Sequence, residues 1–174
     1  MKKSLEYKER FMRDVSLLLH KGVDKRRRKE CENKIIEYAL ENGLTLSSFH
    51  IIIVVLAVLY GSSEADNVCN FKKANPEEHI YNALNDILSL SRVVSMAAQV
   101  HACYAGAKHI FVTDDKALNA LFDYLNTTNI RLIKTENGTQ AMCGLHINPK
   151  MFPQLNEQER DTLLERLKTV LPDE

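Results

Sequence analysis

The sequence predicts an α/β fold in one domain, with a βαβ unit and helical additions at both ends of the chain. Three apolar runs, at residues 49–61, 109–113 and 130–134, have the β-branched composition of buried strands. Amphipathic stretches separate these runs. Because one helical stretch joins the last two, we expect residues 109–113 and 130–133 to be adjacent parallel strands of a βαβ unit.

Length and composition favour one globular domain. The chain has 174 residues, of which 45% are hydrophobic and 26% are charged. We expect a helical N-terminal part (1–46), an α/β core (49–134) and a C-terminal extension (135–174). The formal net charge is zero, so no overall field draws the protein toward nucleic acid or membrane. Locally, however, residues 1–34 carry twelve Lys or Arg against six Asp or Glu, an excess that can attract a polyanion.

The cysteines indicate a reducing, cytoplasmic location. Cys31, Cys69, Cys103 and Cys143 are widely spaced and form no CxxC pair, as is typical of free thiols. No signal pattern opens the sequence. The longest apolar run, residues 51–60, has about half the length of a membrane span. We therefore expect no membrane association.

Two amphipathic helices open the chain. Apolar side chains recur at helical spacing in residues 4–20, and Gly22 ends this pattern. A second helix begins near Asp24 and is closed by Gly43. The apolar stripes of the two helices consist of Leu5, Phe11, Val15, Leu18 and Leu19, and of Cys31, Ile35, Ile36, Ala39 and Leu40.

The middle of the chain begins with residues 49–61, FHIIIVVLAVLYG. We predict a buried strand there, although a buried helix of similar length fits the same pattern. A short helix follows from residues 62–64. The next helix has the clearest start in the chain, with Asn75 as its cap and Pro76 at the first helical position, and it extends to Gly106.

The remaining elements are predicted in the order strand, helix, strand and helix. HIFVT (109–113) is followed by an amphipathic helix at residues 116–126 and by the strand IRLIK (130–134). A turn at Asn137–Gly138 and a loop then lead to a final helix at residues 156–170. The apolar stripe of the first of these helices consists of Leu118, Leu121 and Leu125.

Asp114 and Asp115 stand where the strand at residues 109–113 ends. Ligands of open parallel sheets bind beyond such strand ends, and a close pair of carboxylates suits Mg²⁺. The alternative is that one of the two caps the helix that begins at Lys116. We expect Asp115 to face a cleft and Asp114 to lie closer to the start of the helix.

The stretch VHACYAGAKHIFVTDDKAL resembles the C-terminal half of PIN domains, the fold of many bacterial toxin ribonucleases. The match covers about residues 95–133. LAVLYG (56–61) more weakly resembles an earlier segment of that family. The resemblance implies a PIN-like three-layer sandwich, in which helices flank a mainly parallel sheet. It also implies three or four acids around one or two Mg²⁺ or Mn²⁺ ions. Such ions activate water and stabilise charge at the scissile phosphate.

The residues carry this resemblance only in part. Asp115, with Asp114 beside it, matches the last acidic position of the family. Ser95 and Val58 stand at two positions where the resemblance implies acids. The acidic site is therefore incomplete.

Two further aspartates are candidates to complete the site. The first acid of the family could only be Asp14, in a stretch that favours a helix. Asp86 is a possible substitute, but at about 100° per residue it lies on the face of a continuous helix opposite to Ser95. The candidate catalytic residues are thus Asp115, Asp114, Asp14 and Asp86, with Asp114 and Asp115 as metal ligands.

The run KRRRK, from Lys25 through Arg26, Arg27 and Arg28 to Lys29, is a second candidate site. Basic side chains at a helix start can contact phosphates without reading sequence. The alternative is a solvated helix face that is balanced by the nearby acids Asp24, Glu30 and Glu32.

These observations favour two functions. The first is a metal-dependent ribonuclease that uses Mg²⁺ or Mn²⁺, in a toxin or defence role, with RNA held by Lys25–Lys29. The second is a catalytically degenerate module that binds a protein or nucleic-acid partner. The missing acids at Val58 and Ser95 favour the second function, whereas the aspartate pair and the basic run favour the first.

Overall fold

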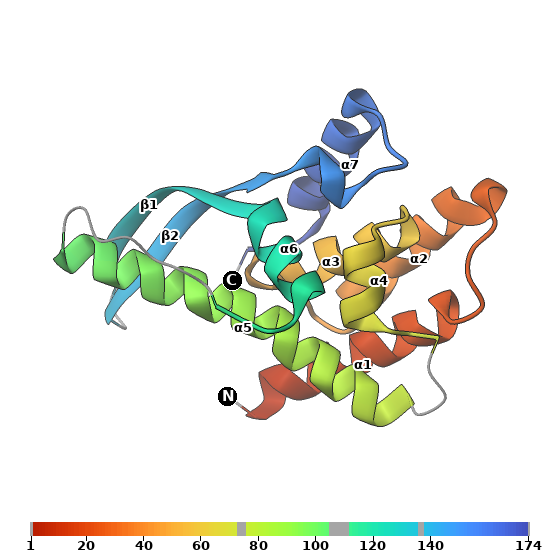
Figure 1. Ribbon diagram of the computed structural model, residues 1–174, viewed down its shortest axis with the longest axis horizontal. Helices are drawn as coiled ribbons and strands as arrows, with labels where there is room; N and C mark the ends of the chain where they lie inside the picture. The colour runs from red at the N-terminus through yellow and green to blue at the C-terminus, as the bar shows by residue number, and fades with distance from the viewer. Residues whose placement is uncertain (1, 73–75, 105–111, 136–137, 174) are drawn as a thin grey trace.

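The computed structural model describes residues 2–72, 76–104, 112–135 and 138–173 (Figure 1). These residues form seven α-helices and one antiparallel pair of strands. The protein is thus mostly helical, and the predicted sandwich of helices around a parallel sheet is wrong.

Five of the helices make up the body of the molecule. They are α1 (Lys2–Leu19), α2 (Arg28–Glu41), α3 (Phe49–Leu59), α4 (Ser63–Cys69) and α7 (Glu157–Val170). A single 3-10 turn, Lys25–Arg27, precedes α2. The predicted helices at both ends of the chain and the short helix after residue 62 are confirmed.

The central helix α3 corrects the prediction of a strand at residues 49–61. Its residues 51–57 are fully buried on every side, between α2, α4 and α5. A helix that is apolar all round belongs in a core. Helical propensity costs a β-branched residue only a few tenths of a kcal/mol, whereas burying its side chain gains about 1.5–3 kcal/mol. The free energy of burial therefore outweighs helical propensity, and these side chains can be buried on a helix as well as on a strand.

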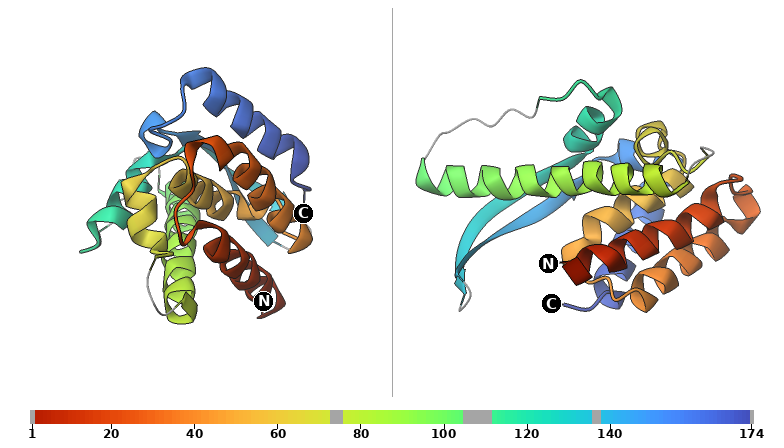
Figure 2. Two further views of the ribbon diagram at one scale, coloured as in Figure 1. Left: turned by 90° about the vertical axis from the view of Figure 1, so that its right-hand side faces the viewer. Right: turned by 90° about the horizontal axis from the view of Figure 1, so that it is seen from below.

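The long helix α5 (Pro76–Cys103) has two different halves. Its N-terminal half packs into the core through Ile80, Leu84 and Ile87. Its C-terminal half leaves the body beside the strands, as both views show (Figures 1 and 2). The predicted helix from residue 76 toward residue 106 is confirmed as far as residue 103.

The strands β1 (Leu125–Thr135) and β2 (Gly138–Ile147) form an antiparallel ladder, from Leu125 opposite Ile147 to Thr135 opposite Gly138. Antiparallel strands need only a short connection, and Asn-Gly is a strong hairpin signal. The predicted strand at 130–134 therefore exists but pairs with the following segment.

The other half of the predicted βαβ unit is not a strand where it is described. Residues 109–111 lie outside the described residues, and residues 112 and 113 have no regular structure. The helix α6 (Lys116–Tyr124) follows as predicted, with Leu118 and Leu121 buried. In the described part of the chain, residues 131–133 pair antiparallel with β2, and the expected parallel partner at residues 109–113 lies mostly outside that part.

In the described part of the chain, no single helix is long and apolar enough to cross a membrane. Residues 46–59 and α4 pass that test of length and composition only together, and they are bent by 114° at their junction.

Candidate functional site

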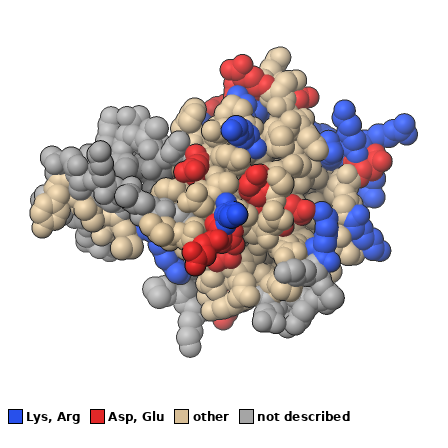
Figure 3. Space-filling view, viewed as in Figure 1, with Lys and Arg blue, Asp and Glu red and all other residues tan. Residues whose placement is uncertain are grey.

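The basic turn, which we define as Lys25–Lys29, consists of the 3-10 turn Lys25–Arg27 and the first two residues of α2, at one end of the body. Gly22, at a φ of +74°, allows the chain to leave α1, and Asp24 caps the turn by accepting the backbone N–H of Arg26 at 2.8 Å. Figure 3 shows Lys and Arg side chains gathered over this end of the molecule. Asp24, one of the acids that we expected to balance the run, therefore has a structural role in the backbone.

Two of the five basic side chains are paired with acids. Arg27 binds Glu30 at 3.2 Å, and this contact raises the pKa of Arg27 and lowers that of Glu30. Lys29 binds Glu32 at 2.6 Å. Within the described residues, the side chains of the other three form no hydrogen bond or ion pair. These three are Lys25, Arg26 and Arg28.

The basic turn is unfavourable for the helix that it starts. The N-terminus of a helix carries a partial positive charge, which favours acids and disfavours bases. In the first turn of α2, Glu30 is the acidic residue. Folding therefore explains Arg27 and Lys29 through their partners, but it does not explain the three unpaired bases.

Beside the basic turn, a groove of about 500 Å³ runs between α2 and α7. We call it the α2–α7 groove. One wall carries Lys25, Arg28 and Lys29, and Tyr60 lies at its base, next to the end of α3. The opposite wall comes from the start of α7 and the segment before it, with Gln154, Leu155, Asn156, Gln158, Glu159 and Thr162.

A buried carboxylate fixes the base of this groove. The side chain of Glu32 is only 2% exposed, and it accepts hydrogen bonds from Lys29, from Arg166 at 2.7 Å and from the hydroxyl of Tyr60. Burial and the bond to Glu32 raise the pKa of Tyr60. Since Arg166 lies on α7 and Tyr60 next to α3, Glu32 joins three helices. Sequence reasoning missed this role, although Glu32 lies beside Cys31 on the buried stripe of α2.

The four predicted catalytic acids come from three segments: α1, α5 and the start of α6. Asp14, on α1, accepts a hydrogen bond from the side-chain amide of Asn42 at 3.1 Å. Asp114 is exposed. Asp115 caps α6 by accepting the backbone N–H of Leu118 at 2.9 Å. The helix-cap alternative is thus confirmed, with Asp115 as the cap, and the expectation that Asp114 serves the helix start is wrong.

Asp86 lies close enough to Asp115 for the two charges to interact. Burial raises the pKa of Asp86, and the charge of Asp115 raises it further. Asp86 belongs to α5 and Asp115 to the start of α6, so packing of the two helices brings them together, which spacing along one helix could not predict.

The set of acids that Mg²⁺ or Mn²⁺ would need is not assembled. The described residues contain no group of three or more His, Cys, Asp or Glu side chains that could hold a metal ion. Val58, at one implied acidic position, packs against the core, and the side chain of Ser95 lies outside the described part.

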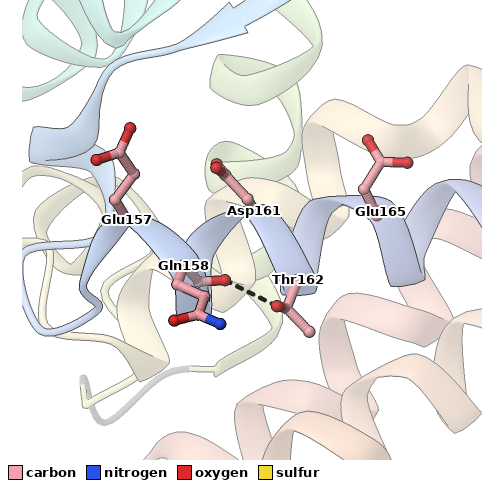
Figure 4. A pocket seen from close by; sticks show the side chains of 5 residues that line it. All are labelled: Glu157, Gln158, Asp161, Thr162 and Glu165. Carbon is pink, nitrogen blue, oxygen red and sulfur yellow. Dashed lines mark hydrogen bonds between the residues drawn. The ribbon is translucent and has the colours of Figure 1, made fainter.

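The outer face of α7 has the opposite charge to the basic turn. Glu157, Asp161 and Glu165 recur at intervals of four residues, with Gln158 and Thr162 beside them (Figure 4). The hydroxyl of Thr162 donates to the backbone carbonyl of Gln158 at 2.7 Å. This is an open face rather than an enclosed site, and acids on one helix face are usually a solvated surface.

Compared with protein-family models, with curated proteins and with solved structures, the chain shows no significant match. The resemblance to PIN domains therefore rests on the residues quoted above, and the sandwich that it implies is not the fold of this chain.

Proposed function

We propose that this protein binds RNA through its phosphate backbone, without reading the base sequence, and that the basic turn makes the contacts. One observation carries the proposal: Lys25, Arg26 and Arg28 have no acidic partner among the described residues and stand at a helix start that disfavours them.

The chemistry of the turn suits phosphates. Lys25 and Arg26 are exposed, so a strand can reach them without rearrangement of the body. Arginine and lysine side chains bind phosphate oxygens by charge-assisted hydrogen bonds, and these contacts hold a strand without selecting its sequence. The overall charge is zero, so this local excess is the feature that can direct a polyanion to one end of the molecule.

The test compares two triple variants that remove the same charge. Lys25→Gln, Arg26→Gln and Arg28→Gln remove the unpaired bases. Lys34→Gln, Lys72→Gln and Lys168→Gln remove bases that are already paired with acids. In a fluorescence anisotropy titration with single-stranded RNA at about 0.1 M salt, we expect the first set to weaken binding at least tenfold and the second to change it little. Equal losses would overturn the proposal, as would a wild-type protein that does not bind RNA.

Metal-dependent RNA cleavage is the second candidate, and the interaction between Asp86 and Asp115 favours it. Asp115→Asn provides a clean test, because Asn caps a helix as well as Asp does. If the candidate is right, RNA cleavage in Mg²⁺ or Mn²⁺ should disappear in this variant while the melting temperature stays nearly unchanged. Wild-type protein that shows neither metal-dependent cleavage nor a metal-induced thermal shift would remove this candidate.

A further inference from the structure

We propose that the α2–α7 groove is a subsite for one phosphate group, with Arg28 as its main ligand and Lys25 as its second. The ligand class is a phosphate ester, supplied either by a nucleotide unit of a bound RNA strand or by a free nucleotide. The strand-bound form of this inference rests on the proposed RNA binding, whereas the free-nucleotide form does not.

Arg28 is the strongest indication. It lies between the α2–α7 groove and a second groove of about 340 Å³. Its Nε atom is buried and has no hydrogen-bond partner among the described residues. A buried donor without a partner is costly, so such a group is usually matched by a ligand or by water. Arginine binds phosphate through Nε and a terminal nitrogen together, so a phosphate in the groove would supply the partner that Nε lacks.

The charges around Arg28 leave the groove attractive to an anion. Two carboxylates, Glu32 and Glu159, line it against the three bases Lys25, Arg28 and Lys29. Glu32 is bound by Lys29, Arg166 and Tyr60. Glu159 accepts the backbone N–H of Asn156 at 2.9 Å in the capping box of α7.

That leaves Lys25 and Arg28 as the groove residues whose positive charge has no acidic partner in the described part of the chain. A phosphate would neutralise them without displacing an existing ion pair.

The far wall offers groups for the rest of a nucleotide. Gln154, Asn156 and Gln158 present side-chain amides, which both donate and accept hydrogen bonds, as the edges of nucleobases do. A volume of about 500 Å³ falls in the range of small-molecule sites. Gly61 permits this arrangement, because a Cβ at its position would overlap the amide of Gln154.

The direct test observes Arg28 itself. In ¹⁵N-labelled full-length protein, the Nε–H signals of the arginines are recorded while AMP is added, and separately while inorganic phosphate or adenosine is added. We expect AMP and phosphate to shift the Nε–H signal of Arg28 saturably, while adenosine does not. Arg28→Lys should weaken the binding of AMP at least tenfold, whereas Arg27→Lys, a matched change at a paired neighbour, should leave it intact.

A second arm separates the two sources of phosphate. RNA that competes with AMP for the Arg28 signal identifies a strand phosphate in the groove. Binding of AMP that RNA does not displace supports the free-nucleotide form, even if RNA binding fails altogether. The inference is overturned if neither AMP, phosphate nor RNA shifts the Arg28 signal, or if Arg27→Lys weakens binding as much as Arg28→Lys does.

Discussion

Two helix starts in this protein carry opposite charges, and they differ in what explains them. At the start of α6, Asp114 and Asp115 meet the positive end of the helix, and Asp115 caps it by accepting the N–H of Leu118. At the start of α2, five consecutive bases meet the same end of a helix, where they are unfavourable. Folding is sufficient to account for the aspartates, but it leaves Lys25, Arg26 and Arg28 unexplained.

This difference decides whether a run of charged residues at a helix start is evidence for a bound ligand. An acid pair at a helix start needs no ligand, because capping and the helix dipole already favour it. Bases in that place are unfavourable for the helix, and our proposal attributes their presence to a bound anion.

Within the basic turn, Lys29 contributes to the stability of the fold because it binds the buried carboxylate of Glu32. Replacing Glu32 with Ala removes the carboxylate that joins α2, Tyr60 and α7, and it leaves the buried hydroxyl of Tyr60 without its partner. We expect a loss of about 2–4 kcal/mol in the free energy of unfolding, measured with urea. Glu30→Ala is the control, since this exposed glutamate should hardly affect the midpoint. Similar midpoints for the two variants would show that Glu32 is not a structural centre.

At the start of α6, Asp115→Ala should lower the stability by about 1 kcal/mol, because the N–H of Leu118 loses its acceptor. Asp114→Ala, one residue earlier, should have a smaller effect, and Asp115→Asn should have almost none. The melting temperatures of the three variants, compared with that of the wild type, measure these effects. A larger loss for Asp114→Ala would restore the assignment that we first expected from the sequence.

At the start of α2, removal of the unpaired bases should not destabilise the protein. The Lys25→Gln, Arg26→Gln and Arg28→Gln triple variant is expected to melt at the same temperature as wild type or slightly higher at low salt, because bases at this helix end are unfavourable. The gain should vanish at high salt, where the charges are screened. A clear drop in melting temperature at both salt concentrations would mean that these side chains stabilise the folded protein.

The smallest effect concerns Asp86. Its pKa is raised by burial and then by Asp115, so the folded state binds its proton more tightly than the unfolded chain does. Stability from this group is therefore lost as the pH rises above the ordinary range of a carboxyl group. Asp86→Asn should melt slightly higher than wild type at pH 7, with the difference shrinking as the pH falls toward 4. A difference independent of pH would exclude the electrostatic cause.

The sequence predicted most helices and missed the fold class, for reasons that are physical. Amphipathic spacing and caps are local, so residues 4–20 and 156–170 were assigned correctly. The apolar run at residues 49–61 has no periodicity that distinguishes a helix from a strand. Its helical structure depends on packing against the surrounding helices. The strand at 130–134 was found without its partner, because pairing depends on the chain that follows, residues 138–147.

The candidate sites were predictable as residue types but not as contacts. The sequence located the basic run and both aspartates. It did not show that Arg27 and Lys29 are paired while Arg28 is not, because Arg28 is set apart by its place between two grooves. The closeness of Asp86 and Asp115 was equally invisible, since it depends on how α5 meets α6.

The central claim is that the unpaired bases of the basic turn exist to hold phosphates. It is tested most directly by the slope of log Kd against log salt for single-stranded RNA. Each phosphate contact contributes about 0.7 to this slope, so losing Lys25, Arg26 and Arg28 should reduce it by about 2. The paired-base triple variant, at Lys34, Lys72 and Lys168, should keep the wild-type slope. An unchanged slope in the first variant, or an equal reduction in both, would contradict the account.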